Sequence, residues 1–478
     1  MTGSVRKLCD DALRAVPSPD GSHIAFLTPA STEVWVAGSN GQDARRIAGP
    51  EPGTRFSPVD WTPDGRRVAW IRSREGEAPA LETCDPEGGP RATVFSDSHL
   101  RLFRWTPDGS VILSMAELPP NDASHSLWEL RVDARGQRAR GRPRRITNWV
   151  GTSTHDLSIT ADGERLAFAR TKVVADVYIA DLVKNGDALT NRRRLTAADR
   201  TSWPSAWTED SRAVVFHSDR NGDFDIYRQG LSSTAPELWF SGRDEQFQGQ
   251  ISPDKTSLLY LEWNPDRRDT GRLMRALLSG EPPRMLFALS GYPIAAQREQ
   301  AFRGRLHTNV YPSFRCPSAS GGNCVVAEVQ QGLVVFTAFD AASGARREMV
   351  KTGADPRNTF WDLSADGARI AFGKRGPASA KGGYLRVITI ADGSVVEVAN
   401  DRLQWDGVGW AADGKSLFVI IYLATGGRIA HVKLDGKATE LYRTIGWVDR
   451  PVASPDGRRL AFSEITYDSN VWMLEHFR

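Results

Sequence analysis

Residues 453–462 read Ala-Ser-Pro-Asp-Gly-Arg-Arg-Leu-Ala-Phe, and variants of this phrase recur along the whole 478-residue chain. The aspartate of each copy is one of Asp20, Asp64, Asp108, Asp162, Asp210, Asp254, Asp366, Asp413 and Asp456. Successive aspartates are 43 to 54 residues apart, except for one interval of 112 residues that spans about two periods. A period of roughly 40–50 residues is typical of propellers and solenoids.

Each copy of the phrase predicts a hairpin. Ser-Pro-Asp-Gly suits a type I turn, because proline presets φ and glycine accepts a positive φ at the end. Leu460 and Phe462 follow the turn with the alternation of a buried strand. A tryptophan three residues before the aspartate marks the entering strand at Trp61, Trp105, Trp207 and Trp410. Third and fourth strands, such as 225–228 and 193–196, complete a four-stranded propeller blade.

The sequence therefore predicts an all-β fold, a β-propeller of about ten four-stranded units over residues 1–478. Nine units carry the aspartate, and a degenerate tenth unit is expected in the long interval, from Tyr311 onward. The units form one large ring or two rings. A strand at 4–9 is predicted to close the last blade, because that blade stops after its third strand. The polar segment 288–310 is the candidate internal boundary.

The recurring aspartates are interpreted as turn caps rather than as a ring of carboxylates. Their oxygens can accept hydrogen bonds from backbone N–H groups of their own turn. In two copies of the phrase, Ser211 and Lys255 stand where the other copies have the turn glycine. A residue other than glycine in the left-handed region costs about 1–2 kcal/mol, so rearrangement of these two turns is expected.

The composition narrows the classes of function. The chain has 61 Lys and Arg against 58 Asp and Glu, with no long basic run, which disfavours nucleic-acid binding by this chain itself. No stretch approaches 18 apolar residues, and residues 1–10 lack the apolar core of a signal peptide. As written, the chain is expected to be a cytoplasmic monomer with no membrane segment. A periplasmic location is the alternative if it is a fragment of a larger protein.

Two of the four cysteines could pair. Cys316 and Cys324 flank a turn-like loop between two predicted strands, and a hairpin could bring them within bonding distance. Free thiols in a reducing cytosol are the alternative interpretation. A disulfide would indicate an oxidising compartment.

The sequence motifs that would indicate catalysis or metal binding are weak. No Gly-x-Ser-x-Gly motif is present, and the most similar string, at 151–155, lacks the second glycine. The eight histidines lack the spacing of a metal site. Residues 219–225 resemble a Ca²⁺ loop without its distal glutamate, so a structural turn is preferred and Ca²⁺ is the alternative. The sequence therefore predicts no catalytic residue, no metal ligand and no cofactor.

Several segments resemble known families. Residues 205–211 and 218–227 resemble the WD40-like repeats of TolB-type β-propellers, and this resemblance covers essentially the whole chain. Residues 315–316, 322–325, 336–340 and 468–472 resemble the C-terminal propeller regions of bacterial receptor-type serine/threonine kinases and winged-helix regulators. The kinase loops and the winged helix are not found in this sequence. In those families the propeller is taken to be a sensing or protein-interaction module.

The expected function is therefore that of a non-enzymatic binding or sensing module in a bacterial signalling or regulatory protein. Loops on one face of a rigid propeller would bind a protein, a peptide or another ligand. One alternative is a propeller hydrolase or lactonase with a metal in its central channel. Another is a periplasmic TolB-like component of an envelope complex.

Overall fold

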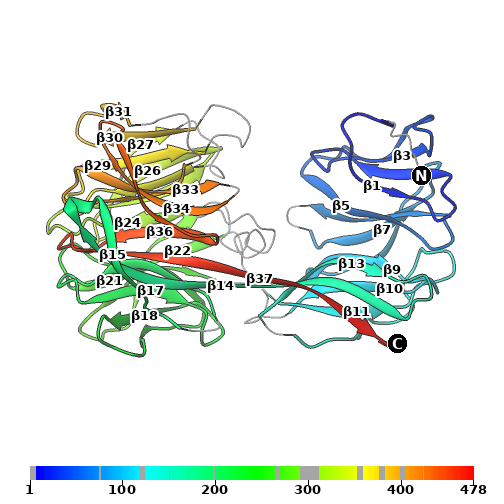
Figure 1. Ribbon diagram of the computed structural model, residues 1–478, viewed down its shortest axis with the longest axis horizontal. Coiled ribbons are helices and arrows are strands. Elements are labelled where there is room, and N and C mark those ends of the chain that lie inside the picture. The colour runs from blue at the N-terminus through cyan, green and yellow to red at the C-terminus, as the bar shows by residue number, and fades with distance from the viewer. Residues whose placement is uncertain are drawn as a thin grey trace. The chain divides into compact units, whose positions relative to one another are not determined.

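The computed structural model describes residues 7–477, except 75–76, 118–123, 150, 198–199, 265–269, 291–311, 353–358, 376–382, 399–404 and 424. The described part is all-β, and its strands form antiparallel sheets of four strands with one of five (Figure 1). The chain divides into two units. Unit 1 is Met1–Lys172 with Asp468–Arg478, and unit 2 is Val173–Tyr467.

Unit 1 contains four blades. The first three are complete four-stranded sheets, and the fourth is built from β13 with the first part of β14 and the last part of β37. The strands are β1 (Leu13–Pro17), β2 (His23–Leu27), β3 (Val34–Gly38), β4 (Arg45–Ala48), β5 (Thr54–Trp61), β6 (Val68–Arg74), β7 (Ala80–Cys84), β8 (Ala92–Ser96), β9 (Leu100–Trp105), β10 (Val111–Ala116), β11 (His125–Leu130), β12 (Arg144–Arg145), β13 (Ser153–Ile159), β14 (Arg165–Val183) and β37 (Arg459–Glu475).

Unit 2 contains six blades. Five are β16–β19, β20–β23, β24–β27, β28–β31 and β32–β35, and the sixth combines β36 with parts of β37 and β14 and with β15. The elements are η1 (Lys184–Gly186), β15 (Ala188–Arg194), β16 (Ser202–Trp207), β17 (Ala213–Ser218), β18 (Asp225–Gly230), β19 (Glu237–Phe240), β20 (Glu245–Ile251), β21 (Ser257–Trp263), β22 (Thr270–Leu277), β23 (Arg284–Ser290), β24 (Ser313–Arg315), β25 (Cys324–Gln330), β26 (Leu333–Phe339), β27 (Arg346–Thr352), β28 (Thr359–Leu363), β29 (Arg369–Lys374), β30 (Tyr384–Thr389), β31 (Val395–Glu397), β32 (Trp405–Trp410), β33 (Ser416–Leu423), β34 (Gly426–Lys433), β35 (Ala438–Arg443) and β36 (Trp447–Ala453).

The six blades of unit 2 form a closed ring. The first strand of each blade is innermost, and β16 lies beside both β20 and β36, as β32 lies beside β28 and β36. β20 lies beside β24, and an ion pair from Arg315 to Asp362 joins β24 to β28. The ring therefore closes between β36, near the end of the chain, and β16. The blade β24–β27 is the degenerate unit predicted in the long interval between the aspartate turns.

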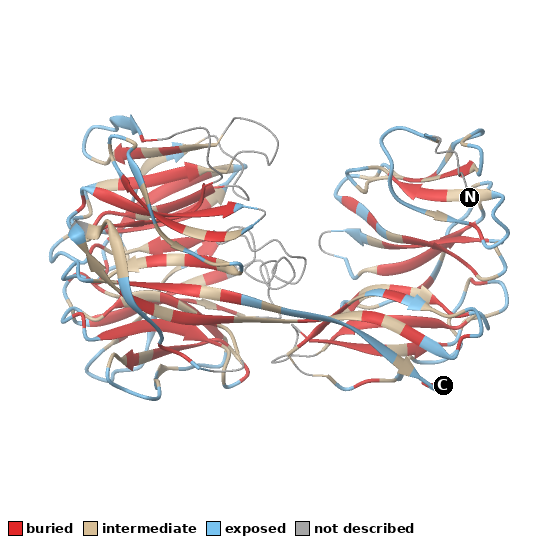
Figure 2. Cartoon of the chain, in the orientation of Figure 1, coloured by how far each residue is buried: buried red, intermediate tan, exposed pale blue. Residues whose placement is uncertain are grey.

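The hydrophobic core lies between neighbouring blades (Figure 2). Tryptophans that precede the turns fix this packing. The indole N–H groups of Trp61, Trp207 and Trp410 each donate to a backbone carbonyl on the inner strand of a neighbouring blade. The acceptors are Val16, Val452 and Asp362 respectively. Each acceptor lies four residues before the turn aspartate of its own blade. The repeat thus sets the blade-to-blade register as well as the hairpin, because a buried indole N–H must find a partner.

Three sequence-based predictions need correction. The last blade is completed by β14 and β15, not by residues 4–9. Residues 1–6 lie outside the described part, and 7–9 form no strand.

The second correction concerns the internal boundary. The chain divides into its two units at 172/173 and 467/468 rather than within 288–310, of which 291–310 lies outside the described residues. The sequence does not reveal this division, because the 19-residue β14 and the 17-residue β37 run through both units.

The third correction concerns the two turns without glycine. Ser211 and Lys255 adopt φ values of 57° and 61°, in the left-handed region that glycine occupies in the other copies. Their backbone N–H groups donate to the carbonyls of Thr208 and Ser252, as the equivalent groups do elsewhere. The turns are therefore not rearranged. The surrounding hairpin imposes the conformation despite its backbone cost.

Candidate functional site

The ring of unit 2 contains a cavity at the end of its channel where the inner strands run into the aspartate turns. It has a volume of about 170 Å³, and all six blades contribute to its walls. We call it the channel cavity and define it by one residue from each inner strand: Trp207, Gln250, Arg315, Asp362, Trp410 and Arg450. A concave site with a few convergent polar groups on a rigid scaffold is the usual location for ligand binding.

β-bulges shape two walls of the channel cavity. The pairing of β20 with β21 shifts between Phe247 and Gln250, and that of β36 with β37 shifts between Asp449 and Val452. Within these bulges, Gln248 and Arg450 have φ values of 54° and 51°. Bulges that re-aim side chains, and strained residues other than glycine, are concentrated at functional sites.

Arg315 and Asp362 form the ion pair of the channel cavity. Arg315 Nε lies 2.9 Å from Asp362 Oδ1, and the backbone N–H of Trp410 donates to Asp362 Oδ2 over 2.8 Å. Burial raises the pKa of Asp362, while the Arg315 guanidinium and these hydrogen bonds oppose that shift. This carboxylate thus joins β24, β28 and β32 and neutralises the charge of Arg315.

Gln250 uses its amide to join two blades. Its Nε2 donates to the carbonyl of Phe314 over 3.2 Å, and its Oε1 accepts from the backbone N–H of Cys316 over 2.7 Å. The amide therefore pairs with the backbone of the short strand β24. A buried polar side chain in this position satisfies backbone groups that would otherwise cost free energy.

Arg450 is held by weaker contacts. Its Nη1 lies 3.4 Å from His217 Nε2, its Nε lies 3.7 Å from Asp449 Oδ2, and its guanidinium lies over the Trp203 ring. Burial lowers the pKa of Arg450 to about 10 and raises that of Asp449 to about 7. Burial, with the charge of Arg450, also places the pKa of His217 well below its usual value. Near neutral pH, Arg450 is therefore charged while His217 is neutral and accepts a hydrogen bond.

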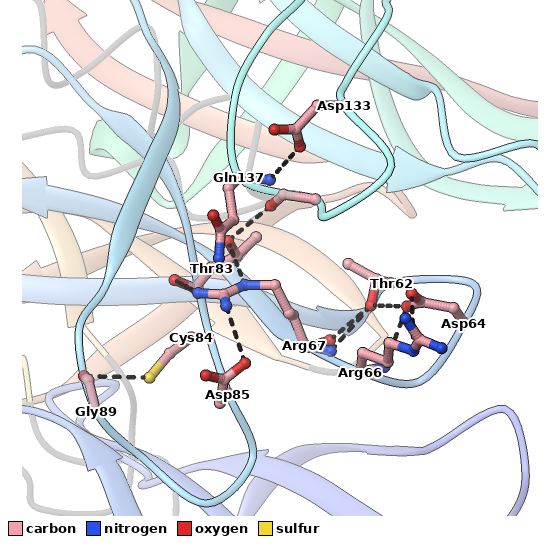
Figure 3. A network of polar contacts seen from close by, with 11 residues as sticks. Thr62, Asp64, Arg66, Arg67, Thr83, Cys84, Asp85, Gly89, Asp133 and Gln137 are labelled. Atoms are coloured by element: carbon pink, nitrogen blue, oxygen red, sulfur yellow. Dashed lines mark hydrogen bonds and ion pairs between the residues drawn. The ribbon is translucent and has the colours of Figure 1, made fainter.

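The recurring aspartates do not meet in the structure. Each lies in its own turn, where the Oδ1 of Asp64, for example, accepts from the hydroxyl of Thr62 over 2.7 Å and from the N–H of Arg66 over 3.1 Å (Figure 3). The backbone contact recurs at Asp20, Asp108, Asp162, Asp210, Asp254, Asp366, Asp413 and Asp456. These hydrogen bonds hold the pKa of most of these carboxyls below the usual value, as for Asp366. The structure therefore places them as scaffold residues.

The sequence interpretation missed the polar residues of the channel cavity. Gln248 and Arg450 lie six residues before their turn aspartates, and Gln250 and Asp362 lie four residues before theirs. A comparison of the repeats at these two positions would have singled out polar residues where other copies have apolar ones, such as Val16 and Leu102. This sequence signal is weak by itself. Only the closed ring shows that the positions six and four residues before the turn aspartates face one channel.

Cys316 and Cys324 are joined by a disulfide, with their Cα atoms 4.2 Å apart. Cys316 also lines the channel cavity, so the bond fixes the loop that forms part of its rim. Disulfides of this kind are typical of oxidising compartments, which leaves the cytoplasmic and the periplasmic expectation open. No helix in the described part of the chain is long and apolar enough to cross a membrane.

The Ca²⁺-like loop at 219–225 is a turn between β17 and β18. Asp219 accepts from the N–H of Thr201 over 2.8 Å, and its carbonyl accepts from the N–H of Gly222. Asp225 is buried, which raises its pKa to about 6. Over the residues that the structure describes, no group of three His, Cys, Asp or Glu side chains is arranged to hold a metal ion.

Ser416, His431 and Asp187 have the distances of a Ser-His-Asp triad. Ser416 Oγ lies 2.6 Å from His431 Nε2, and His431 Nδ1 lies 2.8 Å from Asp187 Oδ1. Ser416 lies three residues after its turn aspartate, and two other blades make structural contacts from that position. Ser257 accepts from Arg275 Nε over 2.7 Å, and Arg67 donates to Thr83 (Figure 3). We therefore interpret Ser416, His431 and Asp187 as a structural cluster whose hydrogen bonds hold neighbouring segments together.

No family model matches the chain. A curated relative, Tricorn protease homolog 1 of Streptomyces coelicolor, is 34% identical over 20% of this chain and 9% of its own length. The uncharacterized peptidase YuxL of Bacillus subtilis is 24% identical over 42% of this chain and 28% of its own. The chain thus spans less than a third of the length of either relative. Solved TolB from Acinetobacter baumannii is 17% identical over 70% of this chain and 62% of its own, with a TM-score of 0.22.

These relatives correct one prediction. The prediction that this chain is a non-enzymatic module is contradicted, because both curated relatives are named as peptidases. That prediction depended on the absence of a catalytic motif such as Gly-x-Ser-x-Gly from this sequence. The resemblance to propellers of receptor kinases and winged-helix regulators stays a prediction, whereas the β-propeller fold is confirmed by the four-stranded antiparallel sheets and by the ring that their inner strands form in unit 2.

Proposed function

We propose that the chain is the substrate-binding propeller part of a peptidase, and that the channel cavity of unit 2 binds a segment of the peptide substrate. The observation that carries this proposal is the channel cavity itself, to which all six blades contribute walls. Its lining combines aromatic surface from Trp207 and Trp410 with the charged groups of Arg315 and Arg450. The names of the two curated relatives support the assignment to a peptidase.

A peptide suits this lining for physical reasons. Aromatic and proline surface can cover apolar side chains of a substrate, while charged groups fix its orientation. The inner strands of a closed ring are rigid, so the walls are already in place and binding loses little conformational entropy. The same features would serve a protein partner on this face of the ring, which was the expectation from the sequence.

The test is peptide binding to the purified chain, with one variant that obstructs the rim and one that does not. Ser318 is exposed and lines the channel cavity, whereas Ser320 is exposed in the same loop but is not part of the lining. We expect Ser318→Trp to weaken the binding of short fluorescein-labelled peptides by about tenfold, measured by fluorescence anisotropy. Ser320→Trp should leave it unchanged. Failure of the wild-type chain to bind any of these peptides, or equal effects of the two variants, would overturn the proposal.

A further inference from the structure

Positive charge predominates in the channel cavity. Arg315, Arg450 and Lys255 line it together with two acidic residues, Asp362 and Glu209. Asp362 pairs directly with Arg315 at 2.9 Å, and Lys255 Nζ donates to the carbonyl of Ser318 over 2.6 Å. Arg450 differs from both, because its contact with the Asp449 carboxylate is long, at 3.7 Å.

The two guanidinium groups also act on each other. Both arginines line the channel cavity, and the charge of Arg315 lowers the pKa of Arg450 because like charges repel. A buried charge is costly unless it is paired, and a guanidinium pairs best with a carboxylate through two parallel N–H···O bonds. A carboxylate brought by a ligand would supply the close pairing that Asp449 supplies to Arg450 only at long range.

We propose that the channel cavity recognises a ligand carboxylate, bound by Arg450 with Arg315 beside it; this inference rests on the proposed function and names the substrate feature that the site selects. In a peptide, that carboxylate is either the C-terminal group or an aspartate or glutamate side chain. Both sources have the same charge and geometry, and peptides with blocked ends distinguish them.

The surroundings of Arg450 give the site a pH dependence. Asp449, whose pKa is about 7, competes for Arg450 only when it is ionised. The other groups that act on this pair are the charge of Arg315 and the side chains of His217, Tyr422 and Tyr467. Burial keeps the histidine neutral and raises both tyrosine pKa values. Binding of a carboxylate should therefore be tighter on the acidic side of neutral pH than on the basic side.

The experiment compares three fluorescein-labelled peptides of one neutral sequence: one with an amide end, one with a free C-terminal carboxylate, and one with an amide end and a single glutamate. We expect at least one carboxylate peptide to bind the wild-type chain about tenfold more tightly than the neutral peptide. Arg450→Gln should abolish that difference. The control Arg386→Gln removes the same charge from an exposed pair with Glu397 on an outer strand and should change nothing.

The outcomes separate this inference from the proposed function. If all three peptides bind equally, the peptide site stands and the carboxylate inference is overturned. If none binds, the proposed function fails, and N-acetylglutamate then tests the anion site alone. A rise in the melting temperature of the wild type, absent in Arg450→Gln, supports the site, and no rise overturns it. Arg450→Lys provides a second variant that keeps the charge without the planar geometry and should bind with intermediate affinity.

Discussion

Two arginines, one in each unit, show how the same repeat provides scaffold in one place and a candidate site in another. In unit 1, the guanidinium of Arg67 lies 2.9 Å from Asp85 and donates to both the hydroxyl and the carbonyl of Thr83 (Figure 3). In unit 2, the guanidinium of Arg450 lies 3.4 Å from His217 and 3.7 Å from Asp449. An arginine with saturated hydrogen bonds stabilises the fold, whereas one held loosely at a cavity can pair with a ligand.

The Arg67 network extends beyond its own blade. The hydroxyl of Thr83 donates in turn to the carbonyl of Gly136, in a loop that the next blade contributes. Gly136 has a φ of 65°, and a Cβ there would lie 3.0 Å from the Thr62 methyl group. The arginine-rich loop around Gly136 packs against the buried Arg67. This loop is therefore part of the scaffold that holds the two blades together.

The largest expected effect tests the two arginines directly. Arg67→Ala removes one ion pair and leaves a buried hydroxyl and carbonyl without their donor, so we expect it to lower the free energy of unfolding by about 3 kcal/mol. Arg450→Ala should lower it by less than about 1 kcal/mol, because its contacts are long and Asp449 can take up a proton. Urea denaturation measures both values. Equal losses would show that the two arginines have the same structural role.

A smaller effect comes from Asp449. Burial raises its pKa to about 7 in the folded chain, above the usual value of 3.8. The folded state therefore holds a proton that the unfolded state has lost, and stability falls as the pH rises through this range. We expect a loss of about 2 kcal/mol between about pH 5.5 and about pH 8.

The matched variant for this prediction is Asp449→Asn, which cannot ionise. It should remove that part of the pH dependence, measured as melting temperature against pH. Asn can still accept the N–H of Arg450, a contact that Asp449 Oδ1 makes over 2.6 Å. A variant with the same pH slope as the wild type would contradict the assignment of the shift to Asp449.

The smallest effect concerns the turns of the two units. Gly21, in unit 1, has a φ of 71° and would gain no close contact from an added Cβ. Gly21→Ala should therefore lower the free energy of unfolding by about 1 kcal/mol through backbone strain alone. Ser211→Gly, in unit 2, should relieve similar strain, offset by loss of the hydrogen bond from Asp456 N to Ser211 Oγ. Differential scanning calorimetry tests whether the two changes shift the melting temperature by different amounts.

Most of the fold could be predicted from the sequence, because blade formation is local. The turn aspartates, their hydroxyl partners and the apolar alternation all lie within about 20 residues of each other, and each hairpin follows from turn chemistry and periodicity. The degenerate blade β24–β27 could be predicted from the interval alone. The channel cavity could not, because Gln250, Arg315, Asp362 and Arg450 come from strands up to 200 residues apart.

The sequence by itself determined the all-β class, the repeat and the turn chemistry, since these depend on contacts between near neighbours in the chain. Only the tertiary structure decided how ten blades divide, with four in unit 1 and six in the closed ring of unit 2 among the described residues. It also decided that β14 and β15, rather than the N-terminal residues, complete the last blade. Ring closure depends on which distant edges pair, and a local pattern carries no information about such pairs.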